Sequence, residues 1–335
     1  MNFHPFLGAL LWPLSLLYGV IVRARVWMYQ KGWLKQKRLK ATVISVGNLT
    51  VGGTGKTPMV IWLAEKLLAE GKRVAILSRG YRGAGGSSDE IELMKFRLQG
   101  RVAVGVGKGR FAEGQRVEAQ QPVDIFLLDD GFQHLQLARD LDILLIDASR
   151  SMQDEWLLPA GRLREPLSAI RRANVVIFTR TEAVPGTLEA IERPSQFPVF
   201  AASTRLLGLR LYGGGIQLQS AEEIGTGPFF AFCGLGNPDA FFRDLQTWGL
   251  PVSGRAVFAD HYRYTERDVL TIRQAAKKAG ANALVTTEKD AQNLSGLKLE
   301  ETPLYISVID LVVSPEADFC NILERLLAAR IGAAA

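Results

Sequence analysis

The sequence has few of the residues that structural metal sites and disulfide frameworks need. Its 335 residues include three histidines and two cysteines, Cys233 and Cys320. Two cysteines so far apart give neither a metal-ligand spacing nor a disulfide framework, which fits a reducing compartment. The absence of a repeat with a period of about 20 to 50 residues excludes a solenoid or propeller. Hydrophobic residues at 47% and charged residues at 22% exclude a disordered chain and a polytopic membrane protein, and the length favours two domains.

Acidic residues are missing from the first 40 positions. Because the whole chain has a net charge of +6, the seven basic residues there leave the remainder at −1. A protein that binds nucleic acid needs basic residues across its fold, so we expect no nucleic-acid partner. The basic residues are Arg23, Arg25, Lys31, Lys35, Lys37, Arg38 and Lys40.

An uncharged, mostly apolar stretch of 17 residues, Phe6–Val22, directly precedes this basic run. A helix of that length is at the lower limit for crossing a bilayer core of about 30 Å. Tryptophan, tyrosine and cationic side chains favour the headgroup layer, so we expect residues 1–38 to form a helix that attaches the protein to an anionic membrane surface, peripherally or monotopically. The segment lacks the basic start and the small-residue cleavage site of a signal peptide. The alternative is a helix packed on the protein's own core.

A glycine-rich loop lies between a strand expected at Ala41–Gly47 and a helix expected at Met59–Ala69. Glycine lets backbone N–H groups turn toward a triphosphate, and a helix N-terminus behind the loop favours the anion. We expect Lys56 to reach the β- and γ-phosphates and Thr57 to bind Mg²⁺. Thr50 stands where the usual motif has its first glycine, and a simple glycine-rich turn is the alternative. The expected nucleotide-binding residues are Thr50, Val51, Gly52, Gly53, Thr54, Gly55, Lys56 and Thr57.

Two carboxylates end the apolar run at Val123–Asp130. An enzyme with a phosphate loop needs a carboxylate at the end of a neighbouring buried strand, because Mg²⁺ keeps waters that must be oriented. Asp129 and Asp130 are therefore the expected metal residues. Their alternative role is to cap the next helix.

Strands that alternate with helical stretches predict an α/β fold with a mostly parallel sheet, helices on both faces and a phosphate-loop topology. The pattern becomes irregular around Leu206–Glu222, and a second, smaller α/β domain follows. The expected division is 1–38 for the membrane helix, 39–210 for the nucleotide domain, 211–222 for a linker and 223–335 for the smaller domain. Further strands are expected at Arg73–Ser78, Val102–Val106, Leu141–Ile146, Val175–Thr179, Pro228–Cys233, Ala283–Thr287 and Leu304–Val308, and helices at Asp239–Trp248, Glu266–Ala279 and Glu316–Ala329.

Polar motifs in the C-terminal half have less specific signals. Gly234–Pro238 lacks the full dinucleotide fingerprint and favours a strand-to-helix turn. His261, in a polar stretch between elements, is a candidate functional group, although a lone loop histidine is more often solvated. Thr287–Asp290 at a strand end has the same ambiguity.

Seven motifs occur in a characteristic order: VGNLTVGGTGKTP at 46–58, LSRGY at 77–81, DDGFQH at 129–134, LPAGRLREP at 158–166, GLGNP at 234–238, ADH at 259–261 and TEKD at 287–290. Taken together, these motifs resemble the tetraacyldisaccharide 4'-kinase (lipid A 4'-kinase) family over nearly the whole chain. The resemblance implies ATP- and Mg²⁺-dependent transfer of the γ-phosphate to the 4'-hydroxyl of a tetraacylated glucosamine disaccharide 1-phosphate, in lipid A biosynthesis. It also implies a location at the cytoplasmic face of the inner membrane, and we see no obligate protein partner.

The resemblance also implies roles for single residues. Glu165 of the LREP motif joins Thr57, Asp129 and Asp130 at the metal, and Lys56 acts on phosphate. An aspartate from an acidic box works with the histidine of the ADH motif to activate the acceptor hydroxyl, which gives Asp89 and His261. The family box reads Gly-Asp-Glu-Pro, whereas this chain has SDEI at 88–91, so the alternatives are Glu90, a shift in register or a solvated acidic turn.

Two other functions are compatible with the motifs. A membrane-attached ATPase with a phosphate loop that switches a protein partner would turn over ATP without a lipid acceptor. A non-catalytic nucleotide-binding module would not need Asp129, Asp130 and His261.

Overall fold

The structure is a computed structural model, and it describes residues 5–80, 88–152, 155–181, 197–225, 227–294, 296–297 and 302–334. Tyr81, the last residue of the LSRGY motif, lies outside them. The chain forms two compact units. Unit 1 contains Met1–Tyr81, Arg97–Ser203 and Val312–Ala335, and unit 2 contains Arg82–Phe96 and Thr204–Leu311.

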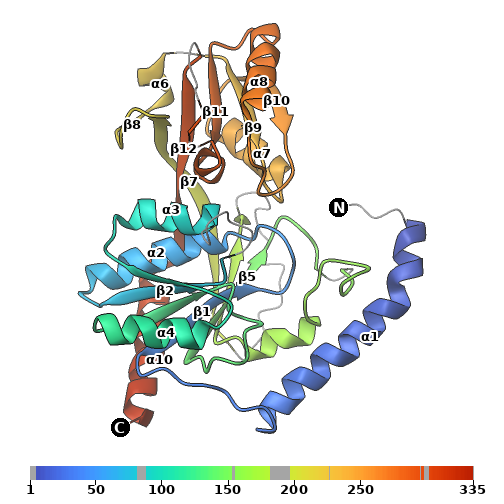
Figure 1. The fold of residues 1–335 in the computed structure, drawn as a ribbon, viewed down its shortest axis with the longest axis vertical. Coiled ribbons are helices and arrows are strands. Elements are labelled where there is room, and N and C mark those ends of the chain that lie inside the picture. The colour runs from blue at the N-terminus through green and yellow to red at the C-terminus, as the bar shows by residue number, and fades with distance from the viewer. Residues whose placement is uncertain are drawn as a thin grey trace. The chain divides into compact units, whose positions relative to one another are not determined.

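Unit 1 contains a parallel sheet in the order β6-β5-β1-β4-β2-β3. The first residues of β7 extend it, since Val176 to Thr179 of β6 pair in parallel with Val199 to Ala202. This confirms the predicted α/β class with a parallel sheet (Figure 1). Its elements are α1 (Pro5–Gln30), β1 (Thr42–Asn48), α2 (Lys56–Ala69), β2 (Val74–Ser78), β3 (Ala103–Val106), α4 (Arg110–Gln120), β4 (Ile125–Asp129), β5 (Leu141–Asp147), η2 (Leu167–Arg172), β6 (Val175–Thr179) and α10 (Glu316–Ala334).

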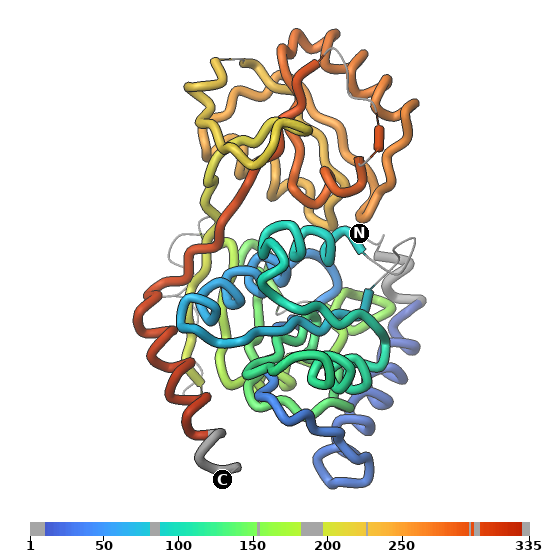
Figure 2. The backbone as a smooth tube through the Cα atoms, turned by 60° about the vertical axis from the view of Figure 1, so that its left-hand side comes forward, coloured from blue at the N-terminus to red at the C-terminus, as the bar shows by residue number. Residues whose placement is uncertain are grey.

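The core of unit 1 follows from strands that are buried along their whole length. Every residue of β2, β4, β5 and β6 is buried, which is why these strands read as continuous apolar runs. Helix α10 packs against α2 through Phe319, whose ring lies edge-on to Trp62 and to Phe200. The last helix of the chain therefore lies beside an early one, as Figure 2 shows.

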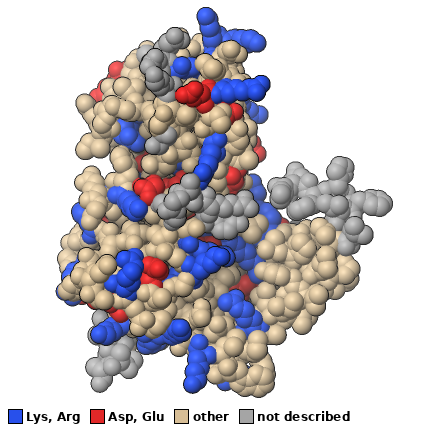
Figure 3. All heavy atoms as spheres, in the orientation of Figure 1, with Lys and Arg blue, Asp and Glu red and all other residues tan. Residues whose placement is uncertain are grey.

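Helix α1 contacts the rest of unit 1 through its polar residues Ser15 and Tyr18. The Ser15 hydroxyl donates to the Leu157 carbonyl at 2.9 Å, and the Tyr18 hydroxyl donates to the Arg164 carbonyl at 2.9 Å. Apolar side chains point the other way, and over α1 the surface is largely uncharged (Figure 3). The most exposed, each more than half exposed, are Leu14, Leu17, Val20 and Ile21. In the described part of the chain, no helix combines the length and apolarity needed to cross a membrane.

Unit 2 has a smaller sheet in the order β10-β9-β11-β12-β7, in which β10, β9, β11 and β12 run parallel and β8 pairs antiparallel with β7. Strands β7 and β12 and helix α3 each continue into unit 1. The second α/β unit is as predicted. Its elements are α3 (Asp89–Leu98), β7 (Val199–Leu211), β8 (Leu218–Gln219), α6 (Ala221–Ile224), β9 (Phe229–Cys233), α7 (Pro238–Thr247), β10 (Val252–Val257), α8 (Glu266–Lys278), β11 (Ala283–Thr287), α9 (Glu288–Gln292) and β12 (Leu304–Ser314).

The boundaries of the units differ from the expected division. Residues 206–211, expected to be irregular, form the end of β7, where buried and exposed side chains mix and the apolar signal is weak. Residues 312–335 belong to unit 1 and not with 223–311, because α10 packs on α2. Residues 82–96 belong to unit 2 although the surrounding sequence belongs to unit 1.

Candidate functional sites

The predicted phosphate loop forms the turn between β1 and α2 of unit 1, in which Thr50 to Gly55 make up the turn and Lys56 and Thr57 begin α2. Gly52 (φ 112°) and Gly55 (φ 82°) have left-handed backbone conformations that other residues rarely adopt. A Cβ atom placed on Gly52 or Gly53 would meet no atom within 4 Å. The loop is therefore open on the side of these two glycines, as anion binding requires.

The LPAGRLREP segment fixes the backbone of this loop. The Val51 N–H donates to the Arg162 carbonyl at 2.8 Å, and the Arg164 N–H donates to the Leu49 carbonyl at 2.7 Å. Thr50 forms a bridge with Leu163. Thr50, which replaces the first glycine of the usual motif, thus has a structural position that a side chain can occupy.

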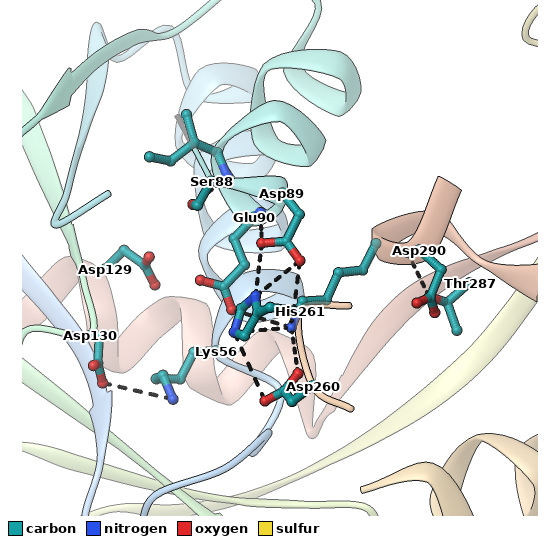
Figure 4. A network of polar contacts seen from close by, with 12 residues as sticks. Lys56, Ser88, Asp89, Glu90, Asp129, Asp130, Asp260, His261, Thr287 and Asp290 are labelled. Carbon is teal, nitrogen blue, oxygen red and sulfur yellow. Dashed lines mark hydrogen bonds and ion pairs between the residues drawn. The ribbon is translucent and has the colours of Figure 1, made fainter. Parts of the chain in front are cut away.

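Lys56 lies at the first position of α2, beside acceptors from two strands. Its Nζ donates to Oδ1 of Asn48 at 3.4 Å and lies 3.7 Å from Oδ1 of Asp130 (Figure 4). Within the described residues, Asn48 Nδ2 and Thr54 Oγ1 are buried polar atoms without a hydrogen-bond partner. Buried donors of this kind normally have a partner, so they fit a site that takes a ligand with several acceptor oxygens.

Asp129 and Asp130 lie at the carboxyl end of β4, next to β1 in the sheet. The Ser78 hydroxyl donates to Oδ2 of Asp129 at 3.1 Å, and Arg110 donates to the Asp129 carbonyl at 3.0 Å. Asp130 has a φ of 49° and accepts two hydrogen bonds from Arg164, at 2.7 and 2.8 Å. Burial raises the pKa of the Asp130 carboxyl, but the charges of Lys56 and Arg164 outweigh it, so that pKa lies below its ordinary value.

The donors expected for Mg²⁺ are a hydroxyl and carboxylates, which are the hard oxygen ligands that this ion prefers. Thr57 lies in the first turn of α2, and the two aspartates follow β4. Both carboxylate oxygens of Glu165 accept hydrogen bonds from Arg172, at 2.7 and 2.9 Å. Among the described residues, no three His, Cys, Asp or Glu side chains form a group that could hold a metal ion. A protein site for Mg²⁺ completed by substrate phosphates needs only one or two carboxylates.

A buried arginine and a histidine, to which the sequence assigned no role, support the two aspartates. Arg110, which donates to the Asp129 carbonyl, also lies 3.3 Å from Nδ1 of His134. Burial and the charge of Arg110 lower the pKa of His134 to about 4, so this imidazole is neutral at pH 7. Arg110 stands far from the DDGFQH motif in sequence, and no local signal connects them.

Unit 2 brings Asp89 and His261 together. Nδ1 of His261 lies 2.9 Å from Oδ1 and 3.0 Å from Oδ2 of Asp89 (Figure 4). The acidic box is the first turn of α3 and not a solvated acidic turn, and its Asp89 side chain is only 4% exposed. Between the two candidate acids, the structure pairs Asp89 with His261, whereas Glu90 is 33% exposed.

Each member of this pair shifts the pKa of the other. Burial raises the pKa of Asp89, but the hydrogen bond with His261 and the charge of Lys289 outweigh it, and that pKa lies below its usual value. The hydrogen bond that His261 donates to Asp89 raises the pKa of His261 above its ordinary value, against the effects of burial and of Lys289. A histidine that shares its proton with a buried carboxylate is typical of acid–base sites.

The TEKD motif contributes a buried aspartate that connects three segments of unit 2. Asp290 is buried and accepts from the Gly234 N–H at 2.8 Å, from the Tyr264 hydroxyl at 2.8 Å and from the Thr287 hydroxyl at 2.6 Å. These contacts join the turn after β9, the residues after His261 and the start of α9. Gly234–Pro238 is thus a strand-to-helix turn from β9 to α7, as predicted.

Comparisons with known proteins all indicate the same family of enzymes. A model described as tetraacyldisaccharide-1-P 4'-kinase matches residues 7–328. The tetraacyldisaccharide 4'-kinase of Geobacter sulfurreducens is 40% identical, over 96% of this chain and 94% of its own length. That of Geobacter metallireducens is 39% identical, over 95% of this chain and 98% of its own length. A crystal structure of LpxK from Aquifex aeolicus in complex with ATP is 33% identical with a TM-score of 0.77, and the match covers 96% of this chain and 99% of that chain.

Proposed function

The chain belongs to the tetraacyldisaccharide-1-P 4'-kinase family, and we propose that its glycine loop and its Asp89–His261 pair perform the two halves of the transfer reaction. The protein is an ATP-dependent lipid kinase of lipid A biosynthesis. The transferred group is the γ-phosphate of ATP, and the acceptor is the 4'-hydroxyl of a tetraacylated glucosamine disaccharide 1-phosphate. The observation that carries the residue assignment is the buried Asp89–His261 contact, which an ATPase without an alcohol acceptor would not need.

The nucleotide half belongs to residues Thr50 to Thr57. The open backbone at Gly52 and Gly53 and the N-terminus of α2 bind the phosphates. Lys56, already near Asp130, places its ammonium on the β- and γ-phosphates, where negative charge moves as the bond to the leaving oxygen breaks. Lys56 therefore stabilises the transition state, and ADP leaves with the bonding electrons.

Thr57, Asp129 and Asp130 would hold Mg²⁺, with Glu165 as a further proposed contributor. The ion would neutralise phosphate charge when bound with ATP. Support comes from the type of donors and from the place of the two aspartates at the end of a strand next to β1. Because Glu165 pairs with Arg172, its contribution includes the orientation of the segment that fixes the loop.

The acceptor half belongs to Asp89 and His261. The 4'-oxygen forms a bond to the γ-phosphorus while the bond from that phosphorus to the β–γ bridging oxygen breaks. The proton of the hydroxyl passes to the Asp89 carboxylate, which is ionised at neutral pH because its pKa is lowered. His261 orients this carboxylate through Nδ1.

The proposed attachment to the membrane rests on α1. Leu14, Leu17 and Ile21 recur with helical spacing on its exposed side, and the basic residues of 23–40 follow. Apolar side chains with a basic flank bind an anionic lipid surface. We infer that α1 lies in the headgroup layer at the cytoplasmic face of the inner membrane, where a lipid acceptor is met.

The test is incubation of the protein with γ-labelled ATP and the acylated disaccharide phosphate in mixed micelles, followed by separation of lipid from water-soluble products. We expect label in the lipid, only when the acceptor has a free 4'-hydroxyl. Release of labelled phosphate into water, equal with and without the acceptor, would instead support an ATPase that switches a protein partner. A 4'-deoxy acceptor is the matched control.

A further inference from the structure

Lys289 lies beside both members of the Asp89–His261 pair. It is the second residue of α9, and its side chain is 17% exposed. Nζ donates to Oδ1 of Asp260 at 3.0 Å and lies 3.5 Å from Nε2 of His261. It also lies 3.8 Å from Oδ2 of Asp89 and 4.0 Å from Oε1 of Glu90.

Three carboxylates from two elements therefore meet at one ammonium group. Asp89 and Glu90 begin α3, and Asp260 precedes His261 in the loop after β10. Among these carboxylates Asp89 is the buried one, so an opposite charge nearby matters most for it. Lys289 supplies that charge, with its ammonium 3.8 Å from Oδ2 of Asp89, and the buried Asp290 beside it anchors α9.

We propose that Lys289 is a positioning residue for the Asp89–His261 pair, which fixes the proton of neutral His261 on Nδ1 and disfavours the imidazolium. This inference rests on the proposed function of the pair. An ammonium group has donors only, so the nitrogen that faces it, Nε2, has to present its lone pair. The N–H of the ring then lies on Nδ1, where it donates to Asp89.

Asp260 also influences which nitrogen of His261 carries the proton. Its Oδ2 lies 3.9 Å from Nε2 of His261 and would favour a proton on that nitrogen. Lys289 donates to the other oxygen of this carboxylate and reduces that attraction. Among the described residues, the charged groups that face His261 are thus Asp89 from α3, Asp260 from its own loop and Lys289 from α9. Glu90 from α3 lies beside the Lys289 ammonium instead. Of these, only Lys289 opposes a second proton on the ring.

The charge of Lys289 also affects how the activity of the pair depends on pH. The charge of Lys289 lowers the pKa of Asp89 and the pKa of His261. The state that accepts the hydroxyl proton has Asp89 ionised and His261 neutral, so Lys289 extends that state to lower pH. Removal of the charge raises both pKa values, and the rising limb of the pH profile of kcat moves to higher pH.

The first experiment compares the wild type with Lys289→Met, which keeps most of the side-chain length and removes the charge. We expect kcat at pH 7 to fall by roughly 10- to 100-fold, with the KM for ATP unchanged and part of the loss recovered at higher pH. Lys289→Arg keeps a cation and is expected to retain the wild-type pH profile. Lys278→Met, an exposed position on α8, is the matched control and should behave as wild type.

The second experiment reads His261 directly and does not need activity. In ¹⁵N-histidine-labelled wild type, with His261 assigned through His261→Gln, we expect neutral His261 as the Nδ1–H form, and its protonation midpoint should rise in Lys289→Met. Wild-type His261 found as the Nε2–H form would overturn the proposal even if Lys289→Met fails to fold.

The outcomes also separate this inference from the proposed function. If the wild type labels the lipid while Lys289→Met keeps the same kcat and pH profile, the kinase assignment stands and the role of Lys289 is refuted. If the wild type does not label the lipid but His261 has the Nδ1–H form and responds to Lys289→Met, the kinase assignment is refuted and the effect of Lys289 on His261 stands.

Discussion

The phosphate loop of unit 1 and the Asp89–His261 site of unit 2 are built in opposite ways. The loop takes its eight residues from one continuous segment, and Asp129 and Asp130 are adjacent at the end of one strand. The Asp89–His261 contact instead joins residues 172 positions apart. In the first site the fold presents a motif that the sequence already contains. In the second site the fold creates the arrangement.

This difference predicts how each site responds to substitution. A residue of the loop works on a ligand, so its replacement should leave its neighbours in place. A residue of the Asp89–His261 site works on another side chain, so replacements there should not act independently.

The largest effect is expected for Lys56→Met. Loss of the ammonium removes charge stabilisation from the phosphates in transfer, so kcat should fall by roughly a thousand-fold or more. The measurement is label transfer to the lipid, with thermal unfolding to show an intact fold. Lys72→Met, on the exposed turn after α2, is the control and should keep full activity. A Lys56→Met protein with near-normal transfer would remove the assignment of the loop.

His261→Gln tests the other side of the comparison. We expect kcat to fall about 100-fold while ATP affinity stays unchanged, because His261 contacts Asp89 and is assigned to the acceptor half of the reaction. The double variant with Asp89→Asn should be little worse than Asp89→Asn alone, since the two side chains act as one group. If the losses of transition-state stabilisation in the two single variants summed to the loss in the double variant, the Asp89–His261 contact would not be used in the reaction.

A smaller effect, on membrane binding, is expected from α1. Leu17→Glu combined with Ile21→Glu puts charge on the exposed apolar side of the helix, so the fraction that sediments with anionic vesicles should drop several-fold. Leu270→Glu, at an exposed leucine of α8 in unit 2, is the matched control. Equal loss of sedimentation in both proteins would contradict a membrane contact carried by unit 1.

The smallest effect concerns stability, and it sharpens the contrast between two histidines. The pKa of His134 is lowered to about 4, so the unfolded chain takes up a proton first and stability falls as pH drops from about 6.5 to 4. His134→Gln should remove on the order of 2 kcal/mol of this acid-induced loss. The pKa of His261 is raised, so its contribution to stability is present below about pH 6.5 and is lost as pH rises through the folded pKa. Urea unfolding of His134→Gln and His261→Gln from pH 4 to 8 measures both contributions. If the free energy of unfolding depended on pH in the same way in the two variants, the opposite pKa shifts of the two histidines would be refuted.

The sequence predicts an element well where burial alone determines its composition. The strands β4, β5, β6, β9 and β11 lie within two residues of their predicted bounds, because they are buried along almost all of their length. The exposed edge strand β10 was missed, since its VSGRAV sequence has no buried residue and includes a glycine. Local patterns also cannot show that residues 82–96 belong to the same unit as residues 204–311, which come much later in the sequence.

The candidate sites follow the same rule. The spacing of glycines before Lys56 predicts the loop, because the chemistry and the backbone turn are in one segment. The choice between Asp89 and Glu90, and the place of Lys289 between Asp260 and His261, depend on long-range packing. Arg110 and Arg164 support the aspartates through contacts that no spacing in the sequence indicates.

The return of α10 to unit 1 has a consequence for synthesis on the ribosome. Residues 204–311, nearly all of unit 2, are translated before α10, whereas unit 1 contains the first strand and this late helix. Until Phe319 emerges, Trp62 and Phe200 lack the ring that packs between them. The unit that starts first is therefore completed last, and a nascent chain stalled before Glu316 would present an unfinished aromatic surface to chaperones.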